Sequence, residues 1–134
     1  MLIALLDPLH IHEDTAHCWF DNHEKAGWAT CPITQNGYVR IVSQVSYGSN
    51  LSVAAAANLL RDLIARPSHE FWPDSESILD AASFDLSRLG SGRHVTDSYL
   101  LGLAKAHGGK FVTLDSRLSV AGVVDGESHL TRLL

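Results

Sequence analysis

Two aspartates, Asp97 and Asp115, are the residues of this 134-residue sequence whose type and spacing best suit chemistry. Two carboxylates on one rim of a sheet bind a hard divalent cation such as Mg²⁺ or Mn²⁺ through their oxygens. A cation held in this way orients a water molecule and offsets the negative charge that grows on a phosphodiester during cleavage. A purely structural interpretation stays open at this point, because an aspartate often caps a helix or opens a turn.

The segment around the two aspartates predicts a helix followed by a strand. Apolar residues recur at helical spacing over residues 99–104, and a Gly-Gly pair then ends the helix. Residues 110–114 form a short apolar run that is typical of a buried strand. Asp97 lies in the first helical turn, at the positive end of the helix dipole, and Asp115 follows the strand. In a parallel sheet, Asp115 emerges at the carboxyl edge, where ligands of open α/β sheets bind.

Two further short runs predict that the sheet is parallel. Residues 28–31 and 69–72 both have the pattern of strands set between helical stretches. Such alternation favours parallel strands that are joined by crossover helices. The predicted fold class is therefore α/β, a parallel sheet flanked by helices, with the carboxyl ends of these strands on the same edge as Asp115.

Two helices are predicted before and after the first of these strands. One covers residues 12–26. The other runs from Pro32 to a break at residues 47–50, because proline favours the first turn of a helix. Its inward side chains are expected to be Val39, Val42 and Val45.

Ser52 is expected to cap a third helix, because its hydroxyl can accept a hydrogen bond from the first turn. The small alanines at 54–57 are expected to let this helix pack closely on the sheet. Residues 73–93 predict short helical turns and a loop, and residues 129–134 an edge strand. The unbroken apolar run of residues 1–6 does not decide between strand and helix.

Length and composition indicate one globular domain over residues 1–134. Apolar residues make up 46% and charged residues 19% of the chain, which is ordinary for a globular protein. The apolar start is too short for a membrane span or a signal core, so we expect a cytoplasmic protein with no membrane segment. Cys18 and Cys31 are accordingly expected to be reduced. The net charge of −5 excludes a broad basic face, so any nucleic-acid contact must be local or assisted by metal.

Other polar residues offer alternatives to the aspartate pair. Gln35 can hydrogen-bond a ligand or simply belong to a helix start, and Arg40 either contacts a phosphate or is a solvated helix residue. Four histidines near the start suggest zinc, although their spacings match no established structural site. These are His10, His12, His17 and His23.

Five stretches match the pattern of one known family, in the family's order and across nearly the whole chain. They are residues 7–12, 28–41, 69–73, 95–104 and 108–115. The most specific matches are Thr96-Asp97 and Thr113-Leu114-Asp115. Together these stretches resemble the PIN-domain ribonuclease toxins of the VapC type.

The resemblance implies Mg²⁺- or Mn²⁺-dependent endonucleolytic cleavage of RNA by the toxin of a type II toxin–antitoxin pair. Members of the family are held inactive by a cognate antitoxin and tend to form homodimers. Two aspartates of the family's site fall on Asp97 and Asp115, which are the expected catalytic and metal-binding residues. Gln35, Arg40 and Thr96 are the residues expected to contact the substrate.

Two features depart from the family pattern. Many relatives carry a glutamate at the position of Gln35, whose neutral amide can still hydrogen-bond a water or a phosphate. The family's first strand and its acid are expected just before residues 2–8, which resemble the following helix. This strand is therefore expected to be missing or to lie upstream of Met1.

A second hypothesis is a catalytically impaired PIN-like module that binds an antitoxin or RNA without cleavage. It depends on the observation that only two of the family's acids have a counterpart here, since two carboxylates plus waters make a weak Mg²⁺ site. A phosphoacceptor domain fits less well, because it needs an acid pair near the first strand and a lysine after a late strand.

Overall fold

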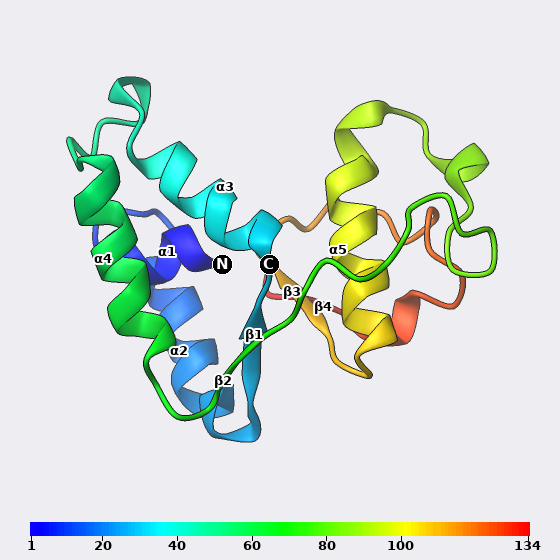
Figure 1. The fold of residues 1–134 in the computed structure, drawn as a ribbon, viewed down its shortest axis with the longest axis horizontal. Coiled ribbons are helices and arrows are strands. Elements are labelled where there is room, and N and C mark those ends of the chain that lie inside the picture. The colour runs from blue at the N-terminus through cyan, green and yellow to red at the C-terminus, as the bar shows by residue number, and fades with distance from the viewer. The chain divides into compact units, whose positions relative to one another are not determined.

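Short parallel strands alternate with helices along the chain, which gives an α/β arrangement (Figure 1). The computed structural model describes residues 1–134 and divides them into two units, Met1–Asp74 and Ser75–Leu134. Each unit contains one two-stranded parallel sheet. No helix in either unit combines the length and the apolar composition that a membrane crossing requires.

The first unit contains four helices and a pair of strands. In chain order these are α1 (Leu2–Leu6), α2 (Glu13–His23), β1 (Trp28–Thr30), α3 (Pro32–Val42), α4 (Val53–Ile64) and β2 (His69–Phe71), with 3-10 turns at Glu24–Ala26 and Val45–Tyr47. Strand β1 pairs with β2 in parallel, so that Trp28 lies opposite His69 and Thr30 opposite Phe71. The chain passes from β1 to β2 through α3 and α4, because parallel neighbours need a crossover connection.

The start of α3 is held by side chains that lie next to the end of β1. Pro32 occupies the first helical turn, and the backbone N–H of Cys31 donates to Thr34 Oγ1 at 2.9 Å. Ser52 caps α4 as predicted, since its Oγ accepts from the N–H of Ala55 at 3.1 Å. These caps give α3 and α4 defined first residues.

Helices α3 and α4 pack against each other and form a core of the first unit. Tyr38 and Val42 of α3 contact Ala56 and Leu60 of α4, and Ala56 is completely buried. The small Ala56 side chain lets the two helices approach closely. The expectation that the alanine face packs on the sheet is therefore wrong, because its buried member faces α3.

The predicted inward position of Val45 is also wrong. Val39 and Val42 pack inward as expected, but Val45 is 93% exposed. Helix α3 ends at Val42, where Ser43 Oγ donates back to the carbonyl of Val39 at 2.7 Å and Gln44 adopts an extended backbone. The helical register that would have turned Val45 inward thus stops three residues earlier.

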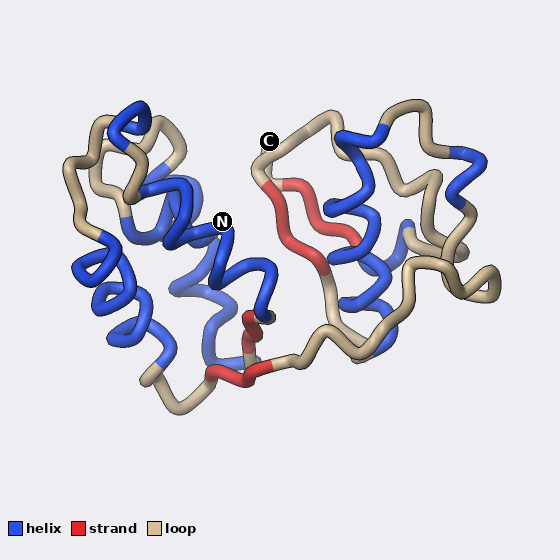
Figure 2. Tube along the Cα trace, turned by 45° about the horizontal axis from the view of Figure 1, so that its top comes forward, coloured by secondary structure: helices blue, strands red, loops and turns tan.

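The second unit is built around a single long helix. Its elements are α5 (Val95–Ala106), β3 (Phe111–Thr113) and β4 (Leu130–Arg132), with 3-10 turns at Leu86–Arg88, Gly92–His94 and Glu127–His129. Figure 2 shows β3 and β4 side by side, and Phe111 lies opposite Leu130 in their parallel register. The predictions of a helix, a strand after it, a strand near residues 129–134 and short turns before the helix are confirmed. The predicted burial of the strand holds for Thr113 only, because Phe111 and Val112 are partly exposed.

Helix α5 provides most of the buried surface of the second unit. Leu101 is fully buried, Leu103 is almost so, and the ring of Phe84 lies directly over Gly102. Gly108, in the left-handed conformation at φ +66°, ends the helix and turns the chain into β3. Asp97 and Asp115 are therefore carried by two elements that one tight turn connects.

Each unit has its own pair of hydrogen-bonded strands. Strand β1 hydrogen-bonds to β2, and β3 hydrogen-bonds to β4. Between β2 and β3 the chain runs through an irregular stretch, residues 72–85, and then through α5. The common edge expected for all the strands stays a prediction.

Candidate active site

Asp97 and Asp115 belong to the second unit, and the charge of Asp115 influences the ionisation of Asp97. Asp97, in the first turn of α5, is half-buried, and Asp115 follows β3 at the surface. Burial raises the pKa of Asp97 above its ordinary value of 3.8, the negative charge of Asp115 raises it further, and His94 partly opposes both. Two neighbouring carboxylates disfavour each other's charge, and a cation between them relieves that repulsion.

The loop that carries Asp115 is held by its own backbone hydrogen bonds. The N–H of Asp115 donates to Thr113 Oγ1 at 3.0 Å, and Asp115 Oδ1 accepts from the N–H of Arg117 at 2.8 Å. The Arg117 side chain is 93% exposed and its Nε lies 3.9 Å from Oδ1, so this ion pair contributes little. Oδ2 is thus the Asp115 oxygen that remains available to a ligand.

Thr96 is exposed in the same helical turn as Asp97. Its hydroxyl group belongs to the second unit, and the residue directly precedes Asp97 in α5. Its contact with a substrate stays a prediction.

Gln35 and Arg40 both lie on α3 in the first unit. Gln35 is half-buried in the first turns of the helix, and its Nε2 donates to Thr30 Oγ1 at 2.9 Å. Arg40 is exposed in the last turn. Contact between these side chains and an RNA substrate stays a prediction.

Sequence reasoning missed two polar side chains that surround Gln35. Thr30 is 3% exposed, and its Oγ1 lies 2.8 Å from Nε2 of His69 on the neighbouring strand. The sequence holds one signal for this contact, since Trp28 and Thr30 alternate on one face of β1 and His69 opens the strand predicted to pair with it. The register that brings His69 to Thr30 is visible only in the structure.

His94 is a further missed neighbour of the aspartates. It ends the 3-10 turn before α5 and lies close enough to Asp97 to lower the pKa of that carboxyl in part. Its position three residues before Asp97, at the start of a predicted helix, is the signal that was available in the sequence.

The zinc alternative finds no support in the structure. Neither unit gathers three or more histidine, cysteine, aspartate or glutamate side chains into a group that can hold a metal ion. Two of the histidines use ring nitrogens for local contacts: His10 Nδ1 accepts from the N–H of His12 at 3.1 Å, and His23 Nδ1 lies 2.7 Å from the carbonyl of Trp19.

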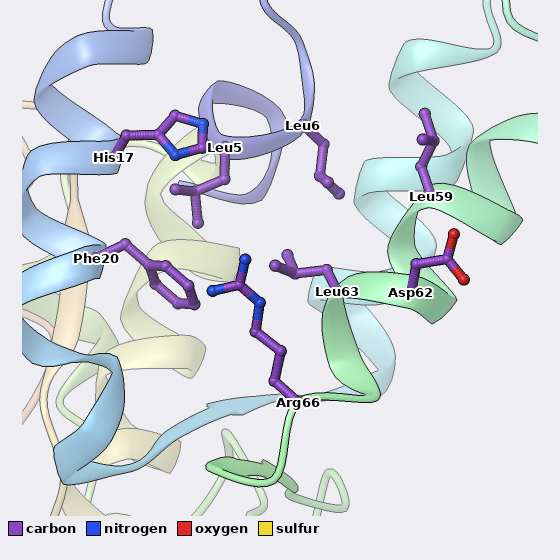
Figure 3. A pocket seen from close by; sticks show the side chains of 8 residues that line it. All are labelled: Leu5, Leu6, His17, Phe20, Leu59, Asp62, Leu63 and Arg66. Atoms are coloured by element: carbon purple, nitrogen blue, oxygen red, sulfur yellow. The ribbon is translucent and has the colours of Figure 1, made fainter.

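The first unit also contains an apolar pocket of about 260 Å³, shown in Figure 3. Arg66 at its edge pairs with Glu24 at 2.5 Å, and its guanidinium lies 5.4 Å from the centre of the Phe20 ring. None of the candidate catalytic or substrate-contacting residues lines this pocket, so it is not the candidate active site. Its lining comes from α1, α2, α4 and the turn after α4: Leu5, Leu6, His17, Phe20, Leu59, Asp62, Leu63 and Arg66.

Comparison with known families identifies the class of this fold. The family model described as "PIN domain" matches residues 1–124, which include both units up to the loop before β4. The chain is therefore a PIN-domain protein.

Curated relatives give the group within that class. "Ribonuclease VapC44" of Mycobacterium tuberculosis is 46% identical over 134 residues, which cover 99% of this chain and 94% of the relative. "Ribonuclease VapC39" of the same organism is 38% identical over 129 residues, 93% of each chain, and "Ribonuclease VapC29" is 39% identical over 119 residues, 89% of this chain and 84% of the relative. The chain belongs to the VapC family, which confirms the resemblance seen in the sequence. No solved structure matches it significantly.

Proposed function

We propose that this chain is a metal-dependent endoribonuclease and the toxin of a type II toxin–antitoxin pair. The ribonuclease names of its VapC relatives support the substrate class. The single observation that carries the chemistry is the closeness of Asp97 and Asp115, since the charge of Asp115 raises the pKa of Asp97. Two carboxylates arranged in this way would hold a cation that offsets the negative charge that builds up on a phosphodiester.

The donor atoms at this place fit Mg²⁺ or Mn²⁺. Both side chains offer carboxylate oxygens, which hard divalent cations prefer. Asp115 offers Oδ2, because its Oδ1 accepts the hydrogen bond from Arg117. Asp97 gains most from a cation, since burial and Asp115 both disfavour its ionised form. A divalent ion bound here supplies charge stabilisation to the scissile phosphate.

The other polar side chains are assigned to substrate contact. Gln35 hydrogen-bonds a water or a phosphate oxygen through its amide, and the exposed Arg40 pairs with a phosphate. Thr96 offers a hydroxyl group beside Asp97. The negative formal charge of the chain means that these local contacts, and not a broad basic face, hold the RNA.

The proposed setting follows from the same family. The match of one family model across both units supports residues 1–134 as a single PIN-like domain. The expected partners are a cognate antitoxin and a second copy of this chain. The free thiols of Cys18 and Cys31 suit the reducing cytoplasm.

The test is cleavage of a labelled RNA by Asp97→Asn, with Mg²⁺ or Mn²⁺ present and with a chelator as blank. The neutral amide is a poorer cation ligand, so we expect cleavage to fall to the chelator background. Asp125→Asn is the matched control, because Asp125 is exposed at φ +53°, a conformation that asparagine tolerates. Full metal-stimulated cleavage by Asp97→Asn would contradict the assignment. RNA or antitoxin binding by a wild-type chain that never cleaves would support the impaired module instead.

A further inference from the structure

Three side chains of the first unit form a continuous line of hydrogen bonds. Gln35 Nε2 donates to Thr30 Oγ1 at 2.9 Å, and Thr30 Oγ1 lies 2.8 Å from Nε2 of His69. The residues come from α3, β1 and β2 respectively. Thr30 in the middle is almost completely buried, so water does not compete for its hydroxyl group.

The hydroxyl group of the middle residue can serve both neighbours. A threonine hydroxyl can donate one hydrogen bond and accept two, and here its oxygen already accepts from the Gln35 amide. His69 Nε2 either accepts the hydroxyl hydrogen, as the unprotonated nitrogen of the imidazole, or donates to the second lone pair of the hydroxyl oxygen. Burial lowers the pKa of His69, while the charge of Glu70 opposes this in part, and the neutral ring is thus favoured at neutral pH.

The backbone holds the three residues in place. Parallel pairing of β1 and β2 fixes His69 opposite Trp28, and the two rings meet edge to face at 4.6 Å. The Cys31–Thr34 cap fixes the first turn of α3, from which Gln35 projects. A side chain held by rigid elements on both sides has little freedom to turn its amide over.

We propose that Thr30 and His69 are positioning residues that fix the orientation of the Gln35 carboxamide, with Nε2 toward Thr30 and the carbonyl oxygen Oε1 turned away from it. With Nε2 bound to Thr30, Oε1 is the end of the amide that is left to meet a ligand. The use of Oε1 rests on the proposed function, in which it accepts a hydrogen bond from a water or from a hydroxyl of RNA. Without Thr30 and His69, the amide can present either its carbonyl or its NH₂ group.

The orientation is measured by NMR on the full ¹⁵N-labelled chain, without RNA or metal. We expect the Gln35 side-chain amide protons to be resolved and in contact with Thr30, and long-range ¹H–¹⁵N correlations to show which ring nitrogen of His69 carries the proton. Thr30→Val keeps the shape of the buried side chain but removes the hydroxyl, so the Gln35 amide signals should move toward those of a free glutamine. Thr30→Ser keeps the hydroxyl and should restore them.

A control separates this effect from general loosening of α3. Ser43→Ala removes a hydroxyl group that bonds the carbonyl of Val39 at the other end of the same helix. It should leave the Gln35 amide signals unchanged. Gln35 amide protons that show no contact with Thr30, or Gln35 signals that are the same in Thr30→Val and wild type, overturn the proposed orientation.

Cleavage kinetics then test its use in the reaction. Misplaced catalytic groups lose roughly ten- to a hundredfold in rate, so Thr30→Val should lower kcat for RNA cleavage by about tenfold or more with a much smaller change in KM. His69→Leu should behave like Thr30→Val, and Thr30→Ser should recover most of the rate. An equal kcat in Thr30→Val and Thr30→Ser overturns the role of this line of hydrogen bonds in the reaction. If the wild type does not cleave RNA at all, the proposed function fails, while the NMR result alone still decides the orientation of Gln35.

Discussion

The guanidinium of Arg132 donates from Nη2 to the carbonyl oxygen of Leu118 at 2.9 Å, and so connects β4 to the loop that follows Asp115. Leu118 is buried, and its carbonyl depends on this charged donor. Nη1 of Arg132 lies 3.6 Å from Oε1 of Glu127. Because Glu127 is mostly exposed, this ion pair contributes little to stability. Arg132 thus holds the segment on which the second candidate ligand is placed.

Replacing Arg132 by methionine should destabilise the second unit by about 1–2 kcal/mol, because a hydrogen bond from a charged group is lost and a buried carbonyl is left unpaired. The methionine keeps most of the apolar stem. Arg117→Met is the matched control, since that side chain is 93% exposed, and it should stay within about 0.5 kcal/mol of wild type. Urea unfolding of the three proteins gives the comparison, and equal midpoints would show that Arg132 does not hold the loop.

Removal of the Asp97 charge should stabilise the metal-free chain. The pKa of Asp97 is raised above 3.8 in the folded state, so the folded chain binds this proton more tightly than the unfolded chain. Its contribution to stability is therefore present at low pH and is lost as pH rises through the raised pKa. The asparagine of Asp97→Asn does not ionise, so this variant does not lose stability as the pH rises. It should melt at a higher temperature than wild type at neutral pH with a chelator present, but not at pH 3. The same difference in melting temperature between Asp97→Asn and wild type at both pH values would show that the raised pKa of Asp97 has no effect on folding stability.

Divalent metal should reverse that order. Mn²⁺ binds the folded pair of carboxylates and not the unfolded chain, so a tenfold excess of free metal over the dissociation constant stabilises the wild type by about 1.4 kcal/mol. Asp97→Asn and Asp115→Asn should each lose this gain, and calorimetric titration should show the loss of binding heat directly. Asp125→Asn, altered at an exposed turn, should keep both. Stoichiometric heat that survives in Asp115→Asn would place the metal elsewhere.

Two glycines in helix interiors should respond to alanine with opposite signs. A Cβ on Gly102 of α5 meets the buried ring of Phe84 at 2.3 Å, whereas a Cβ on Gly37 of α3 meets nothing within 4 Å. Gly37→Ala should therefore stabilise the chain by about 0.5–1 kcal/mol, the usual gain in helix propensity. Gly102→Ala should cost about 1–3 kcal/mol, because the Phe84 ring stacks on Tyr99 and has little room to move. Thermal melts of the two variants test this. A melting temperature above that of wild type in both would mean that the Phe84 ring moves aside at little cost.

The parts of the fold that sequence predicted well are those with local causes. The Gly-Gly stop after α5, the apolar run of β3 and the Ser52 cap each depend on a few adjacent residues, and each is found where it was expected. The closeness of Asp97 and Asp115 follows from the same local order, because a single tight turn separates their elements. Their roles as metal ligands stay a prediction.

The parts that sequence did not predict depend on contacts between distant residues. The hydrophobic period of α3 continues past Val42, but the hydroxyl of Ser43 bonds back to Val39 and the helix ends before Val45. Likewise, periodicity does not say which strands pair, and the pairs β1–β2 and β3–β4 are known only from the structure. The link from His69 to Gln35 needs the register of β1 and β2, which no local pattern contains.

The pairing of β3 with β4 has a consequence for the order in which this protein forms on the ribosome. Both strands of the first unit lie before Ser75, so its sheet can close while the second unit is still being synthesised. Strand β3 leaves the exit tunnel without a neighbour, because its hydrogen-bonding partner is residues 130–132. The backbone next to Asp115 thus gains its strand hydrogen bonds only after residues 130–132 have been made.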